Sequence, residues 1–183
     1  MCIRDRVSVG DEIVDTFFDV DQRRELDLFE AQAIDSIKNK YSSNMVLHAF
    51  QDVVNKFNIT ENLIKSFFES MRMDLTDRSH NEETYKKYIF GSAEVVGLMC
   101  LHIFTNGDKD EFNALEKPAK RLGSAFQKVN FLRDISEDYQ DKGRSYFPNL
   151  DLNKKLNEDD KKIIIEDIEN DFSAAYLGIK KLP

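Results

Sequence analysis

The chain of 183 residues is poor in the residues that crosslink a fold or break its helices. It contains no Trp, only 3 Pro, 7 Gly and 2 Cys. So few turn-forming residues favour long helices over a turn-rich β fold. The two cysteines, Cys2 and Cys100, are far apart and lack metal-ligand or redox spacing, so the sequence indicates neither a disulfide framework nor a zinc site. We therefore expect an all-α fold with reduced, unpaired thiols.

Long apolar runs and a basic surface are missing as well. The apolar runs, such as Val95–Cys100, fall far short of the roughly 20 residues that cross a bilayer, and the chain does not start with a signal-peptide hydrophobic region. A soluble, cytoplasmic chain is expected. The formal net charge of -8 argues against nucleic-acid binding, because neutralising phosphates requires a basic face. The histidines, His48, His80 and His102, are too scattered for a metal set or a dyad.

Apolar residues recur at helical spacing through most of the chain, and its length suits one domain with a substantial core. We predict helices over 44–58, from Thr60, from near Asn81 to Phe104, from 108 to about 138 with Pro118 as a start or a kink, and over 159–182. The stripes of these helices are expected to bury, among others, Phe50, Phe57, Phe126, Val129, Ile163, Phe172 and Ile179. With no internal repeat, the prediction is a single-domain helical bundle.

Two pairs of aspartates stand four residues apart. Asp11 with Asp15, and Asp134 with Asp138, would each lie on one helix face about 6 Å apart. Such oxygens suit Mg²⁺, which takes one or two protein carboxylates and completes its shell with water and substrate phosphates. However, 34 acids in 183 residues should produce roughly six such pairs by chance, most of them solvated surface. The residues around each pair must therefore show whether it is a metal site or ordinary helix surface.

That sequence resembles the phytoene/squalene synthase family. The stretch 127–138, Gln-Lys-Val-Asn-Phe-Leu-Arg-Asp-Ile-Ser-Glu-Asp, followed by Gly-Arg-Ser-Tyr-Phe-Pro at 143–148, is similar to the family's second aspartate-rich signature. Residues 11–15 resemble the first such motif, 88–97 the central tyrosine-glycine helix, and 70–75 a fourth segment. The resemblance covers residues 7–182, in the family's order. It implies an isoprenoid-synthase-type bundle that is incomplete at both ends.

The resemblance also implies roles for particular residues. Mg²⁺, with Mn²⁺ as a substitute, would be held across a cavity by Asp11, Asp15, Asn130, Asp134 and Asp138. The four aspartates and Tyr88 would be the catalytic residues. Gln127, Gly91 and Gly97 would contribute to substrate binding, and Arg133 and Arg144 would contact diphosphate. An intrahelical ion pair with Glu137 is an equal alternative for Arg133. The glycines would allow close helix packing or make room for a prenyl chain.

The implied activity is the head-to-head joining of two geranylgeranyl diphosphates to phytoene. Squalene or dehydrosqualene synthesis from farnesyl diphosphate, and a noncatalytic assembly homologue, are the alternatives. The product would be released through peripheral contact with a membrane. Trans-prenyltransferases and terpene cyclases are disfavoured, because neither motif carries their doubled aspartate.

The chain departs from the family pattern at both ends. Ser8 stands where the family has an arginine, and residues 1–6 read as an unrelated leader or junction before a partial catalytic core over 7–183. Helices that precede and follow this core in the family are expected to cover apolar surface that this chain leaves exposed.

Overall fold

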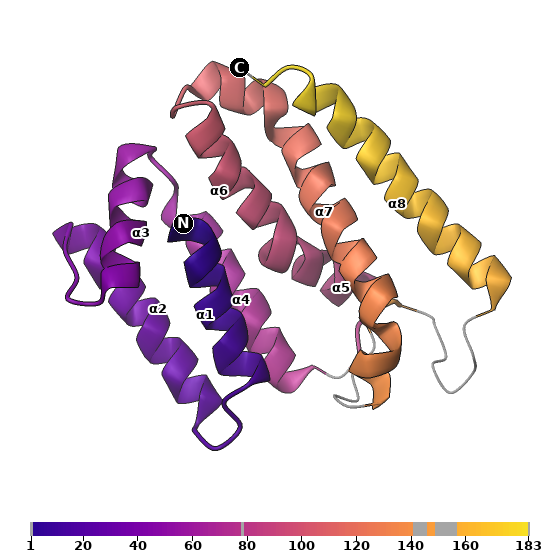
Figure 1. Cartoon of the computed structure of the whole chain (residues 1–183), viewed down its shortest axis with the longest axis horizontal. Helices are drawn as coiled ribbons and strands as arrows, with labels where there is room; N and C mark the ends of the chain where they lie inside the picture. Colours follow the sequence, from indigo (N-terminus) through magenta and orange to yellow (C-terminus); the bar gives the residue numbers. More distant parts are fainter. Residues whose placement is uncertain (1, 78, 141–145, 149–156, 183) are drawn as a thin grey trace.

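The structure, a computed structural model, describes the backbone of residues 2–77, 79–140, 146–148 and 157–182, and side chains at 9–77, 79–135, 146–148 and 157–182. Within these ranges the chain forms an all-helical bundle, as predicted (Figure 1). Its helices are α1 (Cys2–Asp15), α2 (Gln22–Asn39), α3 (Met45–Lys56), α4 (Glu61–Thr76), α5 (Glu82–Ile89), the π-helical turn η1 (Phe90–Glu94), α6 (Val95–Phe104), α7 (Lys109–Gln140) and α8 (Glu158–Ile179).

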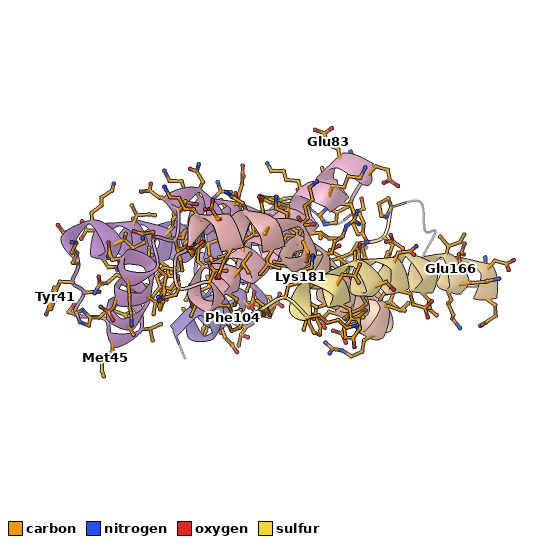
Figure 2. The ribbon with its side chains drawn as sticks, turned by 90° about the horizontal axis from the view of Figure 1, so that it is seen from above. Tyr41, Met45, Glu83, Phe104, Glu166 and Lys181 are labelled. Atoms are coloured by element: carbon orange, nitrogen blue, oxygen red, sulfur yellow. The ribbon has the colours of Figure 1, made fainter. Side chains whose placement is uncertain are left out.

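The helices form two packed groups that share α4 and α6. α1, α2 and α3 pack on one another, and α1 and α2 also pack on α4, while α7 packs on η1, α6 and α8. In Figure 2 the end of the molecule that carries Tyr41 and Met45 lies far from Glu166 on α8, so the bundle is elongated. Each group has its own core, one centred on Phe50, Phe67 and Phe68, and the other on Tyr88 and Phe131.

Local signals explain most helix starts. The Asn44 side chain accepts hydrogen bonds from the backbone N–H groups of Val46 and Leu47, and Asn81 forms a capping box with Thr84 at the start of α5. Thr60 stands at the N-cap of α4, although its side chain makes no capping bond. The third predicted helix is a continuous run of α5, η1 and α6, whose π-helical turn the sequence did not reveal.

Three expectations about helices need correction. α2 was not predicted, although Asp21 caps it and Leu26, Phe29 and Ala33 bury one side of it. Pro118 lies inside α7, so it does not start this helix, and the alternative that it kinks the helix stays a prediction. Several stripe residues expected in the core are exposed on α7 and α8, because this face has no further described helix over it: Phe126, Val129, Ile163 and Ile179.

A buried charge cluster fastens α8 to α7. The carboxylate of Asp171, with 0% of its area exposed, accepts hydrogen bonds from Arg121 Nη1 at 2.6 Å, Ser124 Oγ at 2.8 Å and Lys128 Nζ at 2.8 Å. Lys128 is 7% exposed and also pairs with Asp167. Burial alone would raise the pKa of Asp171, but the hydrogen bonds from Lys128, Arg121 and Ser124 outweigh it and hold that pKa below its ordinary value.

One helical stretch in the described part of the chain, Glu82–Phe104, is long and apolar enough to cross a membrane by length and composition. In the fold its α6 portion packs between α4 and α7, and its Val95, Leu98 and Met99 are buried. The α6 portion therefore contributes to the core of the bundle.

Candidate functional site

The first aspartate pair lies on the last turns of α1. Val14, 2% exposed, anchors this turn in the core, whereas Asp11 and Glu12 are exposed and Asp15 is half-buried. Gln22 Nε2 donates to the carbonyl oxygens of Ile13 at 2.9 Å and Val14 at 2.8 Å, and so caps the carboxyl end of α1 from the start of α2. The position of Asp11 and Asp15 is therefore fixed by two contacts that the sequence did not reveal.

Asp11 and Asp15 interact as like charges, as their spacing predicted. Although Asp11 is exposed at one side, the surrounding protein atoms remove part of its water and raise its pKa to about 6. The carboxylates of Asp15 and Glu12 add to that rise. A carboxylate so placed is stabilised by any cation that binds beside it.

We expect this pair to make folding stability depend on pH in metal-free buffer. Folded Asp11 takes up its proton near pH 6, whereas the unfolded carboxyl does so near 3.8, so its protonation adds to the free energy of unfolding as pH falls from about 6 to 3.8. The measurement compares urea unfolding of wild type and Asp11→Asn at pH 7 and pH 5 in chelator. The free energy of unfolding of wild type should increase, relative to that of Asp11→Asn, at the lower pH.

Asp52→Asn, which changes an exposed carboxyl on α3, is the matched control and should behave as wild type in this comparison. An Asp11 carboxyl carbon whose NMR shift titrates near pH 4 in chelator would contradict the expectation.

The second polar face runs along α7. Gln127, Asn130 and Asp134 follow one another at intervals of three and four residues, so they share one side of the helix. Gln127 and Asp134 are half-buried, and Asn130 is exposed. Arg133 donates from Nε and Nη2 to the two oxygens of Asp134, each at 2.6 Å. The alternative ion pair of Arg133 with Glu137 stays a prediction, because the side chain of Glu137 lies outside the described residues.

In the part of the chain whose side chains the structure describes, the two faces do not form one cluster of acids. Among the described side chains, no three of the His, Cys, Asp and Glu residues are grouped closely enough to hold a metal ion. α1 and α7 stand on either side of α6 (Figure 1). The side chains of Ser8 and Asp138 and the whole of Arg144 lie outside the described residues. A magnesium site shared by both faces therefore stays a prediction.

An apolar cavity of about 410 Å³ opens beside the second face, between α6, α7 and the end of α8. Gln127 lines it and also belongs to the polar face, so the cavity and that face are contiguous. Phe104 lines it close to the end of α8, near Lys181 (Figure 2). Its lining is almost entirely apolar, and the buried Oγ of Ser92 has no hydrogen-bond partner in the described structure. This arrangement suits a ligand with an apolar tail and a polar head.

The two predicted glycines have different surroundings. A Cβ on Gly91 would lie 2.6 Å from the carbonyl oxygen of Ser66, so its absence lets η1 approach α4. A Cβ on Gly97 would lie 2.8 Å from the carbonyl oxygen of Ala119, and Gly97 also lines the cavity. Close packing thus explains both glycines, and only Gly97 borders the space where a ligand tail would lie.

Tyr88 belongs to a buried cluster of rings. It is 4% exposed, and its hydroxyl donates to Asp74 Oδ2 at 2.8 Å. Burial, with the charge of Asp74 second, raises the pKa of Tyr88 well above its ordinary value, so the phenol stays neutral. Tyr146 also donates to Asp74, and the ring of His80 lies beside both tyrosines. Neither Asp74 nor His80 was predicted to have a role from the sequence, where the only signal for Asp74 is its place in the 70–75 segment.

Comparison with known proteins places these features in context. A sequence profile for squalene/phytoene synthase matches residues 7–171. Phytoene synthase 2 of Solanum lycopersicum is 33% identical over 69% of this chain and 41% of its own length. The 4,4'-diapophytoene synthase of Staphylococcus haemolyticus is 28% identical over 80% of this chain and 50% of its own. The chain thus spans about half the length of these curated relatives.

Two solved structures share the fold. Squalene synthase HpnC from Alicyclobacillus acidocaldarius superimposes with a TM-score of 0.82 at 19% identity, covering 97% of this chain and 71% of that one. A dehydrosqualene synthase determined with a ligand superimposes at 0.80 and 22% identity, covering 100% and 67%.

Proposed function

The chain belongs to the squalene/phytoene synthase family, and we propose that it is the catalytic core of a prenyltransferase that joins two geranylgeranyl diphosphates into phytoene. The observation that carries this proposal is the apolar cavity of about 410 Å³ that meets a polar helix face at Gln127. A prenyl diphosphate has the matching division into a long apolar chain and an anionic head.

The residues present fit a divalent cation. Burial raises the pKa of Asp11 and the charges of Asp15 and Glu12 add to that rise, so a cation bound beside this carboxylate would stabilise it, and Asn130 and Asp134 offer further oxygens on α7. Asp11, Asp15, Asn130, Asp134 and Asp138 would hold Mg²⁺, or Mn²⁺ in its place. When bound, the cation supplies positive charge that stabilises a departing diphosphate. Because Mg²⁺ takes only one or two protein carboxylates, a cluster of three described acids is not required.

The chain's own residues would carry the rest of the reaction. The cavity lining holds the prenyl chains and excludes water while the C–O bond of the first donor breaks and its electron pair leaves with diphosphate. The double bond of the second donor attacks the allylic cation, and proton loss closes a cyclopropylcarbinyl diphosphate. A second loss of diphosphate, rearrangement and proton loss yield phytoene without a reductant. Tyr88 offers an aromatic face to the positive charge, and Arg133 and Arg144 would contact the leaving diphosphate.

Product length is the finer part of the proposal. The segments 85–101 and 123–138 resemble bacterial phytoene synthases, and the tomato relative at 33% identity bears that name. Squalene or dehydrosqualene synthesis from farnesyl diphosphate is the alternative, favoured by the names of the two structural neighbours.

The test is chromatography of the products formed by the purified protein with Mg²⁺ and each diphosphate separately. We expect a C40 hydrocarbon from geranylgeranyl diphosphate, with no reductant added. A C30 hydrocarbon formed from farnesyl diphosphate alone would replace the phytoene assignment. No turnover of either substrate by a folded, Mn²⁺-binding protein would favour the noncatalytic assembly homologue.

We also propose that this reaction occurs in the cytoplasm, with peripheral contact to a membrane that receives the apolar product. Residues 1–6 are proposed to lie outside the catalytic core, although residues 2–6 continue α1 in the structure.

A further inference from the structure

Three separate segments meet at the carboxylate of Asp74. Asp74 lies near the end of α4 and is 8% exposed. Its Oδ2 accepts the hydroxyl of Tyr88 from α5 at 2.8 Å, and its Oδ1 accepts the hydroxyl of Tyr146 from the segment after α7 at 3.2 Å. One carboxylate therefore fixes two phenols that come from different parts of the chain.

The two phenol rings belong to a continuous aromatic wall. Tyr146 stacks on Phe131 with ring centroids 4.2 Å apart and an interplanar angle of 6°, and Tyr88 lies 5.8 Å from Phe131. The ring of His80 also stacks on Tyr146, with ring centroids 5.6 Å apart and an interplanar angle of 13°. The wall is thus built from side chains of four separate segments.

The wall borders the polar face of α7. Phe131 follows Asn130 directly and precedes Asp134 by three residues, so its side chain is about 60° around the helix from Asp134. A diphosphate held at Asp134 would release its allylic cation on the side of the helix next to these rings. The rings can accept that positive charge only if their faces keep a fixed orientation.

We propose that Asp74 is a positioning residue that acts through Tyr88 and Tyr146. Its carboxylate orients both rings, and the hydrogen bonds it accepts increase the electron density of the phenols that face the cation. This inference rests on the proposed prenyltransferase function. A role in packing alone would not require a buried charge, because apolar side chains hold rings together without the desolvation that a carboxylate suffers.

The test compares Asp74→Asn, Tyr146→Phe and the double variant in the purified protein with Mg²⁺ and geranylgeranyl diphosphate. Asp74→Asn should lower kcat by about 10-fold with little change in KM, because the affected contact strengthens as charge develops. The released cyclopropylcarbinyl diphosphate should increase relative to phytoene. Tyr146→Phe should show a smaller change in the same direction, and the double variant should be no slower than Asp74→Asn, since both changes remove one linked contact.

Tyr85→Phe is the matched control. Tyr85 contacts Phe131 and Phe147 in the same cluster but does not share the Asp74 carboxylate, so it should keep the wild-type kcat and product ratio. An Asp74→Asn protein with wild-type kcat and product ratio would overturn the inference. The inference would also be overturned if Tyr85→Phe showed the same loss of kcat as Asp74→Asn and an equal fall in melting temperature.

A spectroscopic measurement separates this inference from the proposed function. The chain has no Trp and 6 Tyr, so its ultraviolet emission reports tyrosine directly. A phenol that donates to a carboxylate is quenched, so Asp74→Asn should raise the emission, and the rise should shrink when Tyr146 is already Phe. If the wild-type protein makes no hydrocarbon, the proposed function fails, yet this emission change still supports Asp74 as the group that holds the phenols. Unchanged emission would contradict that role whatever the activity.

Discussion

Replacing Asp134 by Asn is expected to lower turnover with Mg²⁺ by about 100-fold or more, because a carboxylate that helps to hold the cation at the leaving diphosphate supplies several kcal/mol to the transition state. Asp134 lies on the face of α7 that continues into the cavity through Gln127, and Arg133 already binds both of its oxygens. Asn keeps the shape of the side chain but removes its charge. The measurement is kcat for hydrocarbon formation.

Binding of Mn²⁺, followed by electron paramagnetic resonance, tests the same ligand without turnover and should weaken in Asp134→Asn. Asp110→Asn is the matched control, because it removes a carboxylate from the exposed first turn of the same helix. It should leave both measurements close to wild type. Unchanged turnover and Mn²⁺ affinity in Asp134→Asn would remove the catalytic assignment of this residue.

Replacing Asp171 by Asn is expected to lower the free energy of unfolding by about 3 kcal/mol. Asp171 is fully buried and accepts hydrogen bonds from three side chains of α7, so its loss leaves Lys128 buried with only the exposed carboxylate of Asp167 as a partner. Urea unfolding of wild type and variant at pH 7 measures the difference. Because α7 carries Asn130 and Asp134, detachment of α8 would also loosen the cavity wall.

Asp167→Asn is the control for this cluster, since its carboxylate is 54% exposed and contacts the same lysine. Asp167→Asn should lower the free energy of unfolding by less than about 1 kcal/mol. The pKa of folded Asp171 is lowered, so its contribution is present above its ordinary value of 3.8 and is lost as pH falls below it. A loss under about 1 kcal/mol in Asp171→Asn would show that the cluster adds little to stability.

The spacing of apolar residues predicted the helices well where the apolar stripe of a helix packs against the core of the bundle. The 44–58 segment became α3, with Leu47, Phe50 and Val54 buried as expected. The same reasoning was wrong for Phe126 and Ile179, because a stripe shows which face is apolar and not what covers it. Here that face borders the cavity, so its apolar residues are available to a ligand.

The candidate site was predictable only where it is local. Four-residue spacing predicted that Asp11 and Asp15 interact, and the charge of Asp15 contributes, after burial, to the raised pKa of Asp11. The Tyr146–Asp74 bond joins residues 72 positions apart, and no periodic pattern reports a contact over that separation. The buried Asp171 was missed for a similar reason, because its three donors lie on another helix.

The π-helical turn η1 sets the angle around the helix axis between Tyr88 on α5 and Gly97, which borders the cavity from α6. In this turn Val95 N–H bonds to the carbonyl of Phe90, five residues earlier, so the helix carries one residue more than an α-helical path needs. Successive residues are about 100° apart around a helix, so this extra residue rotates α5 by that amount relative to α6. A chain one residue shorter within 90–94 would still be helical, yet it would turn Tyr88 away from Asp74 while Gly97 stayed at the cavity. The count of residues between the tyrosine and the glycine is therefore under as strict a geometric constraint as their identities.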